Sequence, residues 1–195
     1  MANTNAPFGF SQYSGNGSAP TYEQVPVVIA YNASAIYYGD PVEPDGSGTV
    51  VRGDGTTGAA GIAGIFVGCT YLSVSQKRTV WSNYWPGSDV ASTSTVTGYI
   101  INDPNAKFLV QVGPTGLTQA EVNSNIGYDI GTGNTANGLS GAFVTEASLA
   151  TTNTLPFRVI GLVTQPPGSA GTEAGAYNRV IVAFNNVSTK ALTSV

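Results

Sequence analysis

Short apolar runs, separated by clusters of glycine, proline, asparagine and aspartate, limit what this 195-residue chain can fold into. Such runs, rich in β-branched and aromatic residues, are typical of strands rather than of helices of ordinary length. In residues 107–112, for example, Phe108, Val110 and Val112 fall on one face, which indicates a half-buried strand. Other segments of the same character are 25–31, 36–38, 49–52, 65–74, 139–145, 157–163 and 177–184.

Turn and cap signals complete the predicted architecture. The turn-rich residues 39–48, followed by the apolar residues 49–52, predict a hairpin with a loop. Thr118 and Glu121 have the spacing of a capping box, and Gly127 would end a short helix after about two turns. We therefore predict a mainly β fold, a small barrel or sandwich of short strands with long Gly/Ser/Thr-rich loops, an extended N-terminal arm and one short helix.

The N-terminal 24 residues differ in composition from the rest of the chain. Residues 1–24 are rich in Asn, Ser, Gly and Pro but also carry aromatic residues, so we predict an extended arm that docks on a neighbouring subunit, with a frayed terminus as the alternative. Residues 25–195 then form the β-rich domain, which could be divided into two β subdomains joined near residues 113–118. Deleting residues 1–20 is expected to leave the fold intact.

The composition argues against most chemistry. The chain has no histidine, one cysteine and only 9% charged residues, so the usual proton shuttles and metal ligands are scarce. We expect a protein that is not an enzyme and holds no cofactor or metal. Seven scattered basic residues against eleven acidic ones disfavour nucleic acid as a partner, and no apolar run is long enough for a membrane span. Cys69, in an apolar context, is expected to be a buried side chain.

Three short motifs have functional interpretations that we consider weaker than structural ones. Residues 53–58 match the string G-x-G-x-x-G, but further glycines stand where a helix should begin, so a loop is favoured over a dinucleotide site. Residues 52–54 spell Arg-Gly-Asp, a cell-adhesion tripeptide that arises often by chance. A solvated turn is favoured over a cation site for the nearby acidic residues Asp40, Glu43, Asp45 and Asp54.

Both tryptophans and a tyrosine fall within five residues, at Trp81, Tyr84 and Trp85. Such a cluster could anchor a protein interface, plug one end of a barrel, or stack on sugars. Single-stranded nucleic acid would require basic residues interleaved with these aromatic ones, and only Lys77 and Arg78 lie near.

Several motifs, in one order along nearly the whole chain, resemble a family of tailed-bacteriophage virion proteins that decorate or cement the capsid. In that family's pattern an acidic residue tends to precede the Tyr177-Asn178 pair, whereas Gly175-Ala176 stand here. The segments that carry the resemblance are 1–10, 38–42, 64–71, 84–87, 99–111, 131–136, 155–162 and 176–182.

The resemblance implies a non-enzymatic, β-rich protein in the virion, on the outer capsid surface, after assembly in the host cytoplasm. It would bridge subunits of the major capsid protein and associate with itself as a dimer or trimer. A host- or carbohydrate-binding module of a head fibre or tail is the alternative. A glycan-cleaving enzyme with paired carboxylates is a third, less favoured hypothesis. The predicted interface residues are Pro7, Phe8, Phe10 and Tyr13 in the arm, and Trp81, Tyr84 and Trp85 in the aromatic cluster.

Overall fold

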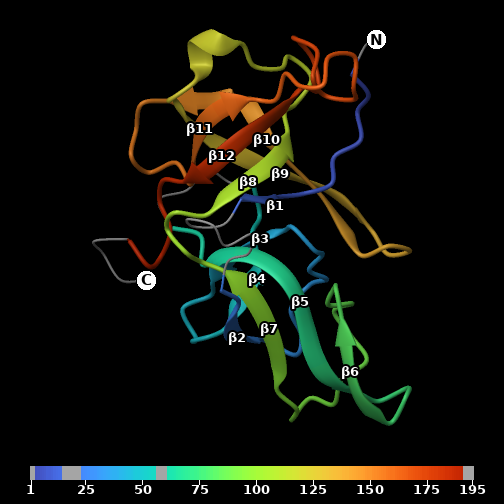
Figure 1. Ribbon diagram of the computed structural model, residues 1–195. Coiled ribbons are helices and arrows are strands. Elements are labelled where there is room, and N and C mark those ends of the chain that lie inside the picture. Colours follow the sequence, from blue (N-terminus) through green and yellow to red (C-terminus); the bar gives the residue numbers. More distant parts are fainter. Residues whose placement is uncertain (1–2, 15–22, 56–60, 191–195) are drawn as a thin grey trace.

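The computed structural model describes residues 3–14, 23–55 and 61–190, and the fold is mainly β, as the sequence predicts. Two six-stranded sheets form two lobes arranged one above the other (Figure 1). The strands are β1 (Ser11–Ser14), β2 (Val25–Ile29), β3 (Pro41–Pro44), β4 (Val50–Arg52), β5 (Gly64–Ser73), β6 (Arg78–Ser82), β7 (Val96–Ile101), β8 (Lys107–Gln111), β9 (Asn125–Asn134), β10 (Leu139–Ala150), β11 (Phe157–Leu162) and β12 (Arg179–Phe184).

The lower lobe of Figure 1 contains β2 to β7 in the order β3-β4-β2-β7-β5-β6. Strand β3 also pairs with β5, which closes five of these strands into a small barrel and leaves β6 as an added edge strand. The predicted hairpin of residues 39–52 is confirmed, because β3 and β4 pair antiparallel. Residues 36–38 form isolated bridges instead of the strand expected there.

The upper lobe contains β1 and β8 to β12 in the order β1-β8-β12-β11-β9-β10. A parallel bridge between Val112, directly after β8, and Val144 of β10 brings the two sides of this sheet together. Each lobe has its own hydrophobic cluster, but Ile65 of β5 and Ile101 of β7 belong to the cluster of the upper lobe. The two lobes therefore pack directly against each other.

The N-terminal segment is part of the upper lobe. Phe10 is only 1% exposed and its ring stacks on Phe157, with 4.4 Å between ring centroids. Strand β1 pairs with β8, and the side chain of Gln111 accepts the N–H of Ala6 and donates to the carbonyl of Thr4. Residues 3–14 therefore pack on their own chain instead of forming the predicted extended arm. Phe10 is part of the core of this chain, and deletion of residues 1–20 would remove it from that core.

The predicted helix is a single turn. The capping box of Thr118 and Glu121 is present, but only the 3-10 turn η1 (Gln119–Glu121) follows it. Val122 is already extended, and Gly127 lies within β9 instead of ending a helix. Among the described residues, no helix has the length and apolarity needed to cross a membrane.

The change from one sheet to the other occurs earlier than expected. The chain leaves the lower sheet after β7 and enters the upper sheet at β8, so the connection is residues 102–106 and not 113–118. The glycines and proline of residues 113–118 belong to a loop inside the upper lobe. Leu117 in this loop is buried in the upper core, and its N–H and carbonyl are both bonded to the side chain of Asn178.

Replacing Phe10 by Ala is expected to lower the free energy of unfolding by about 3–5 kcal/mol, because it leaves a cavity among three aromatic rings. Urea unfolding followed by circular dichroism measures this change. The control is Tyr13→Ala, which removes a 53% exposed ring from β1 and should change stability by less than about 1 kcal/mol. A similarly small loss for both variants would contradict the docking of this segment on the core.

Candidate functional site

The structure separates the three residues of the predicted aromatic cluster. Trp85 is fully buried in the lower core, where its indole N–H donates to the carbonyl of Ala33 at 3.2 Å. The ring of Tyr84 is half-buried and stacks on Tyr37 at a centroid distance of 5.6 Å. Trp81, on the edge strand β6, is 64% exposed. The prediction that Trp85 is an interface residue is therefore wrong, because its side chain is fully buried and has no exposed surface for a partner.

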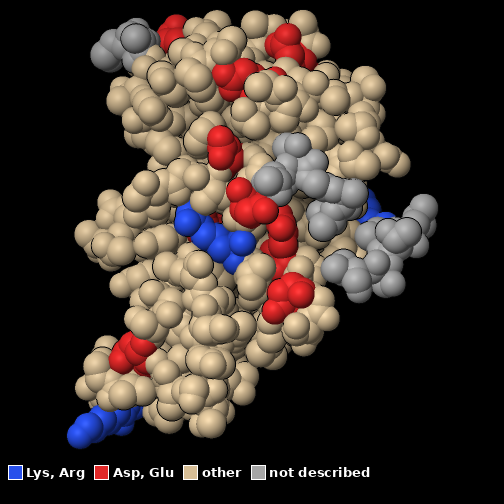
Figure 2. All heavy atoms as spheres, turned by 180° about the vertical axis from the view of Figure 1, so that it is seen from behind, with Lys and Arg blue, Asp and Glu red and all other residues tan. Residues whose placement is uncertain are grey.

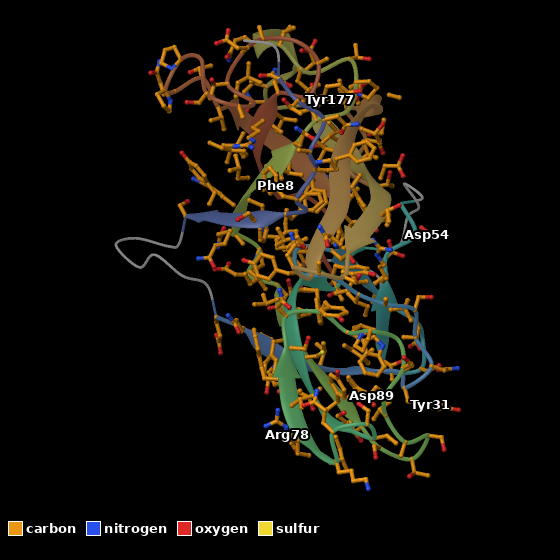
Figure 3. The ribbon with its side chains drawn as sticks, turned by 90° about the vertical axis from the view of Figure 1, so that its right-hand side faces the viewer. Phe8, Tyr31, Asp54, Arg78, Asp89 and Tyr177 are labelled. Carbon is orange, nitrogen blue, oxygen red and sulfur yellow. The ribbon has the colours of Figure 1, made fainter. Side chains whose placement is uncertain are left out.

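The predicted interface residues of the N-terminal segment also range from buried to exposed. Phe10 is buried and cannot contact another chain. Phe8 is half-buried against the upper lobe (Figure 3), and the guanidinium of Arg179 lies 5.1 Å from its ring centroid. Pro7 is half-buried, and Tyr13 is exposed. The structure therefore leaves Tyr13 and Trp81 as the most accessible of the predicted interface residues.

An uncharged surface surrounds Trp81. Antiparallel register places Val28 of β2, Thr97 of β7, Thr70 of β5 and Trp81 of β6 in one row across four strands. At a strand spacing of about 4.8 Å, this row is about 14 Å wide. Side chains alternate between the two faces of a strand, so the neighbouring outward positions extend the same surface. We call this surface the outer face; its members are Pro26, Val28, Thr70, Leu72, Thr79, Trp81, Thr97 and Tyr99.

The indole of Trp81 rests on the sheet. A Cβ atom at Gly68 would lie 2.9 Å from Cζ2 of Trp81, so the absence of a side chain at Gly68 makes room for the ring. Gly68 is also paired in register with Tyr99, the other aromatic residue of the outer face. Leu72, 50% exposed, is a diagonal neighbour of Trp81, and Val28, 43% exposed, stands at the other end of the row beyond Thr70 and Thr97. Three exposed large apolar side chains on one uncharged sheet face make this surface the candidate for an interaction.

The sequence analysis identified Trp81 but missed the rest of the outer face. The sequence signal for it is the alternation of apolar and polar residues in residues 96–101, where Val96, Gly98 and Ile100 are buried and Thr97 and Tyr99 are half-buried. To place these residues beside Trp81, the register of this strand with β5 and β6 must also be known, and the sequence does not provide that register.

Charged side chains gather midway along the molecule, where the two lobes meet (Figure 2). Asp40 is fully buried there and is paired with Arg52 at 2.7 Å between Oδ2 and Nε. The carboxylate also accepts the N–H of Tyr37 at 2.7 Å and the hydroxyl of Ser140 from β10. Burial raises the pKa of Asp40 above its ordinary value, although the charge of Arg52 opposes this shift.

The acidic residues near Asp40 each have a structural partner. Glu43 accepts the phenol hydroxyl of Tyr128, and burial raises the pKa of the Glu43 carboxyl. Asp45 accepts the N–H of Ser47 at 2.8 Å in an exposed turn. Within the described ranges, no group of three or more carboxylate, thiol or imidazole side chains could hold a metal ion.

The remaining sequence motifs also have structural explanations. Arg52 of the Arg-Gly-Asp string is engaged with Asp40 and also donates to the carbonyl of Gly131 at 3.1 Å. A side chain at Gly53 would collide with the hydroxyl of Tyr128. The string at residues 53–58 extends outside the described residues. Cys69 is buried, as expected, and burial raises the pKa of its thiol to about 12.

No protein-family model, no curated protein and no solved structure matches this chain.

Replacing Asp40 by Asn is expected to lower the free energy of unfolding by about 3 kcal/mol, because it leaves the largely buried guanidinium of Arg52 without its opposite charge. Thermal or urea unfolding checks this value. The exposed Asp129→Asn change is the matched control and should alter stability by about 0.5 kcal/mol or less. Equal effects of the two substitutions would show that the buried Asp40–Arg52 pair does not contribute to the free energy of unfolding.

Proposed function

We propose that this chain is a virion structural protein of a tailed bacteriophage. It binds the outside of the capsid through the outer face of the lower lobe and cements neighbouring subunits of the major capsid protein. The observation that carries the proposal is the outer face itself, an uncharged surface across four strands with an exposed tryptophan. The resemblance to capsid decoration proteins supports this choice of partner.

The physics of the outer face suits a permanent contact. Burying threonine, valine and aromatic side chains requires less desolvation than burying charged ones, and tryptophan and tyrosine are enriched among residues that dominate binding energy. A protein that binds only the assembled shell stabilises that state by mass action. Repeated over many lattice positions, a modest affinity for each copy therefore stabilises the whole head. Self-association as a dimer or trimer belongs to the same proposal.

The first test is co-sedimentation of the purified protein with heads that lack it, comparing expanded heads with unexpanded precursor shells. Saturable binding to expanded heads, at a stoichiometry commensurate with the lattice, is the expected result. Trp81→Ala should weaken this binding by about thirtyfold, the equivalent of about 2 kcal/mol for a central aromatic contact. The free energy of unfolding should change little, because the ring is 64% exposed.

The matched control is Tyr13→Ala, which removes an exposed ring from the other lobe. Binding within about twofold of the unmodified protein is expected for this variant. A larger loss for Tyr13→Ala than for Trp81→Ala would assign attachment to the N-terminal segment instead of the outer face. Absence of binding to either form of the head would overturn the proposal.

A carbohydrate-binding module of a head fibre or tail is the second candidate, and the placement of Trp81 favours it. An indole that lies on a glycine and faces solvent is a suitable platform for the apolar face of a sugar ring. This function predicts quenching or enhancement of tryptophan fluorescence by a saccharide in a glycan screen. The change should disappear in Trp81→Phe, which keeps only the buried Trp85. A screen without any Trp81-dependent change excludes this candidate.

A further inference from the structure

The upper lobe has a second surface feature, a hollow of about 490 Å³ over β8, β11 and β12. Three of the seven basic residues of the chain, Lys107, Arg158 and Lys190, line this hollow, and none of the eleven acidic residues does. The chain as a whole has a net charge of −4. We call this feature the basic hollow, because it gathers positive charge on a chain that is acidic overall.

Strand register explains the shape of the basic hollow. Lys107 of β8 is paired with Ala183 of β12, and Ala183 is paired with Arg158 of β11. The three side chains therefore form one row, in which a small residue lies between two long cationic ones. Two strand spacings separate the cationic residues by about 10 Å. Lys190 adds a third positive charge, and Ile160, 38% exposed, adds an apolar wall.

Neutral groups hold Arg158 in place. Its Nε donates to the side-chain oxygen of Asn125 at 3.0 Å, and its Nη2 donates to that of Asn185 at 3.1 Å. Amide oxygens orient the guanidinium without neutralising its charge. A guanidinium has five N–H donors, so donors remain for a ligand, and its planar shape suits a carboxylate.

We infer that the basic hollow binds an acidic peptide segment of a partner protein. Two cationic side chains about 10 Å apart match two carboxylates better than one small anion. A segment in the polyproline II conformation advances about 3.1 Å per residue with three residues per turn, so acidic side chains three positions apart lie on the same side, about 9 Å apart, and would reach both cations. The apolar wall at Ile160 would contact the aliphatic part of such a segment. This inference does not depend on which surface the outer face covers.

The test uses a fluorescein-labelled peptide of six glutamates, with a peptide of six glutamines as the uncharged control. Fluorescence anisotropy with the full chain should show saturable binding of the hexaglutamate and none of the hexaglutamine. The affinity should fall as salt is added, because the contacts are solvent-exposed ion pairs. Absence of saturable binding at low salt would overturn the inference.

Three variants with the same change in net charge locate the binding site. Arg158→Gln removes a cation from the hollow, and Ala183→Glu places a carboxylate on its floor while leaving the contacts of Arg158 with Asn125 and Asn185 intact. Each should weaken hexaglutamate binding by about tenfold. Arg78→Gln, at the far end of the lower lobe (Figure 3), is the control and should stay within about twofold.

Equal losses for all three variants would show non-specific attraction and overturn the inference. If Arg158→Gln does not fold, Ala183→Glu decides the outcome, since it leaves the Arg158 contacts in place. Inorganic phosphate serves as the competitor. Displacement of the hexaglutamate by phosphate at concentrations equal to that of the peptide would identify a small-anion site and contradict a peptide site.

Discussion

The buried carboxylate of Asp40 is the interaction on which the arrangement of the two lobes depends. It lies directly before β3 in the lower lobe, pairs with Arg52 at the end of β4, and accepts the hydroxyl of Ser140 from the upper lobe. A buried charge is tolerated only where its partners replace the lost hydration. The hairpin of β3 and β4 and the start of β10 must therefore come together in one geometry. A backbone bond from Phe10 to Gly39 adds the N-terminal segment to the same junction.

This junction explains why the two lobes form one structure. A small β lobe encloses little volume, so side chains from outside its own sheet help to complete its core. The upper core takes Phe10 from the N-terminal segment and Ile65 and Ile101 from strands of the lower sheet. Removal of either contribution would leave a cavity in the upper core. The upper core is thus incomplete without residues of the lower sheet, whereas the lower cluster consists of residues of its own lobe.

Local patterns were sufficient to predict the mainly β class, the β3–β4 hairpin and the alternating strands such as β8, because each depends on residues close in sequence. Strand β9 was missed because three glycines interrupt its apolar pattern, and β6 because most of its residues are exposed. The sequence does not predict that Trp81 is exposed and Trp85 is buried. Both are aromatic residues near a turn, and only register and the path of the chain decide which one enters the core.

The few charges of this chain are placed where they do not interfere with its two candidate surfaces. Asp40 and Arg52 satisfy each other at the junction, and Lys77 and Arg78 stand at the start of the edge strand β6. Charges at an edge oppose pairing with a strand of another molecule, so the uncharged outer face can be exposed without inviting edge-to-edge aggregation. The cations of the basic hollow lie on the other lobe. The two proposed sites therefore lie on different lobes, and occupation of one does not require the other to be covered.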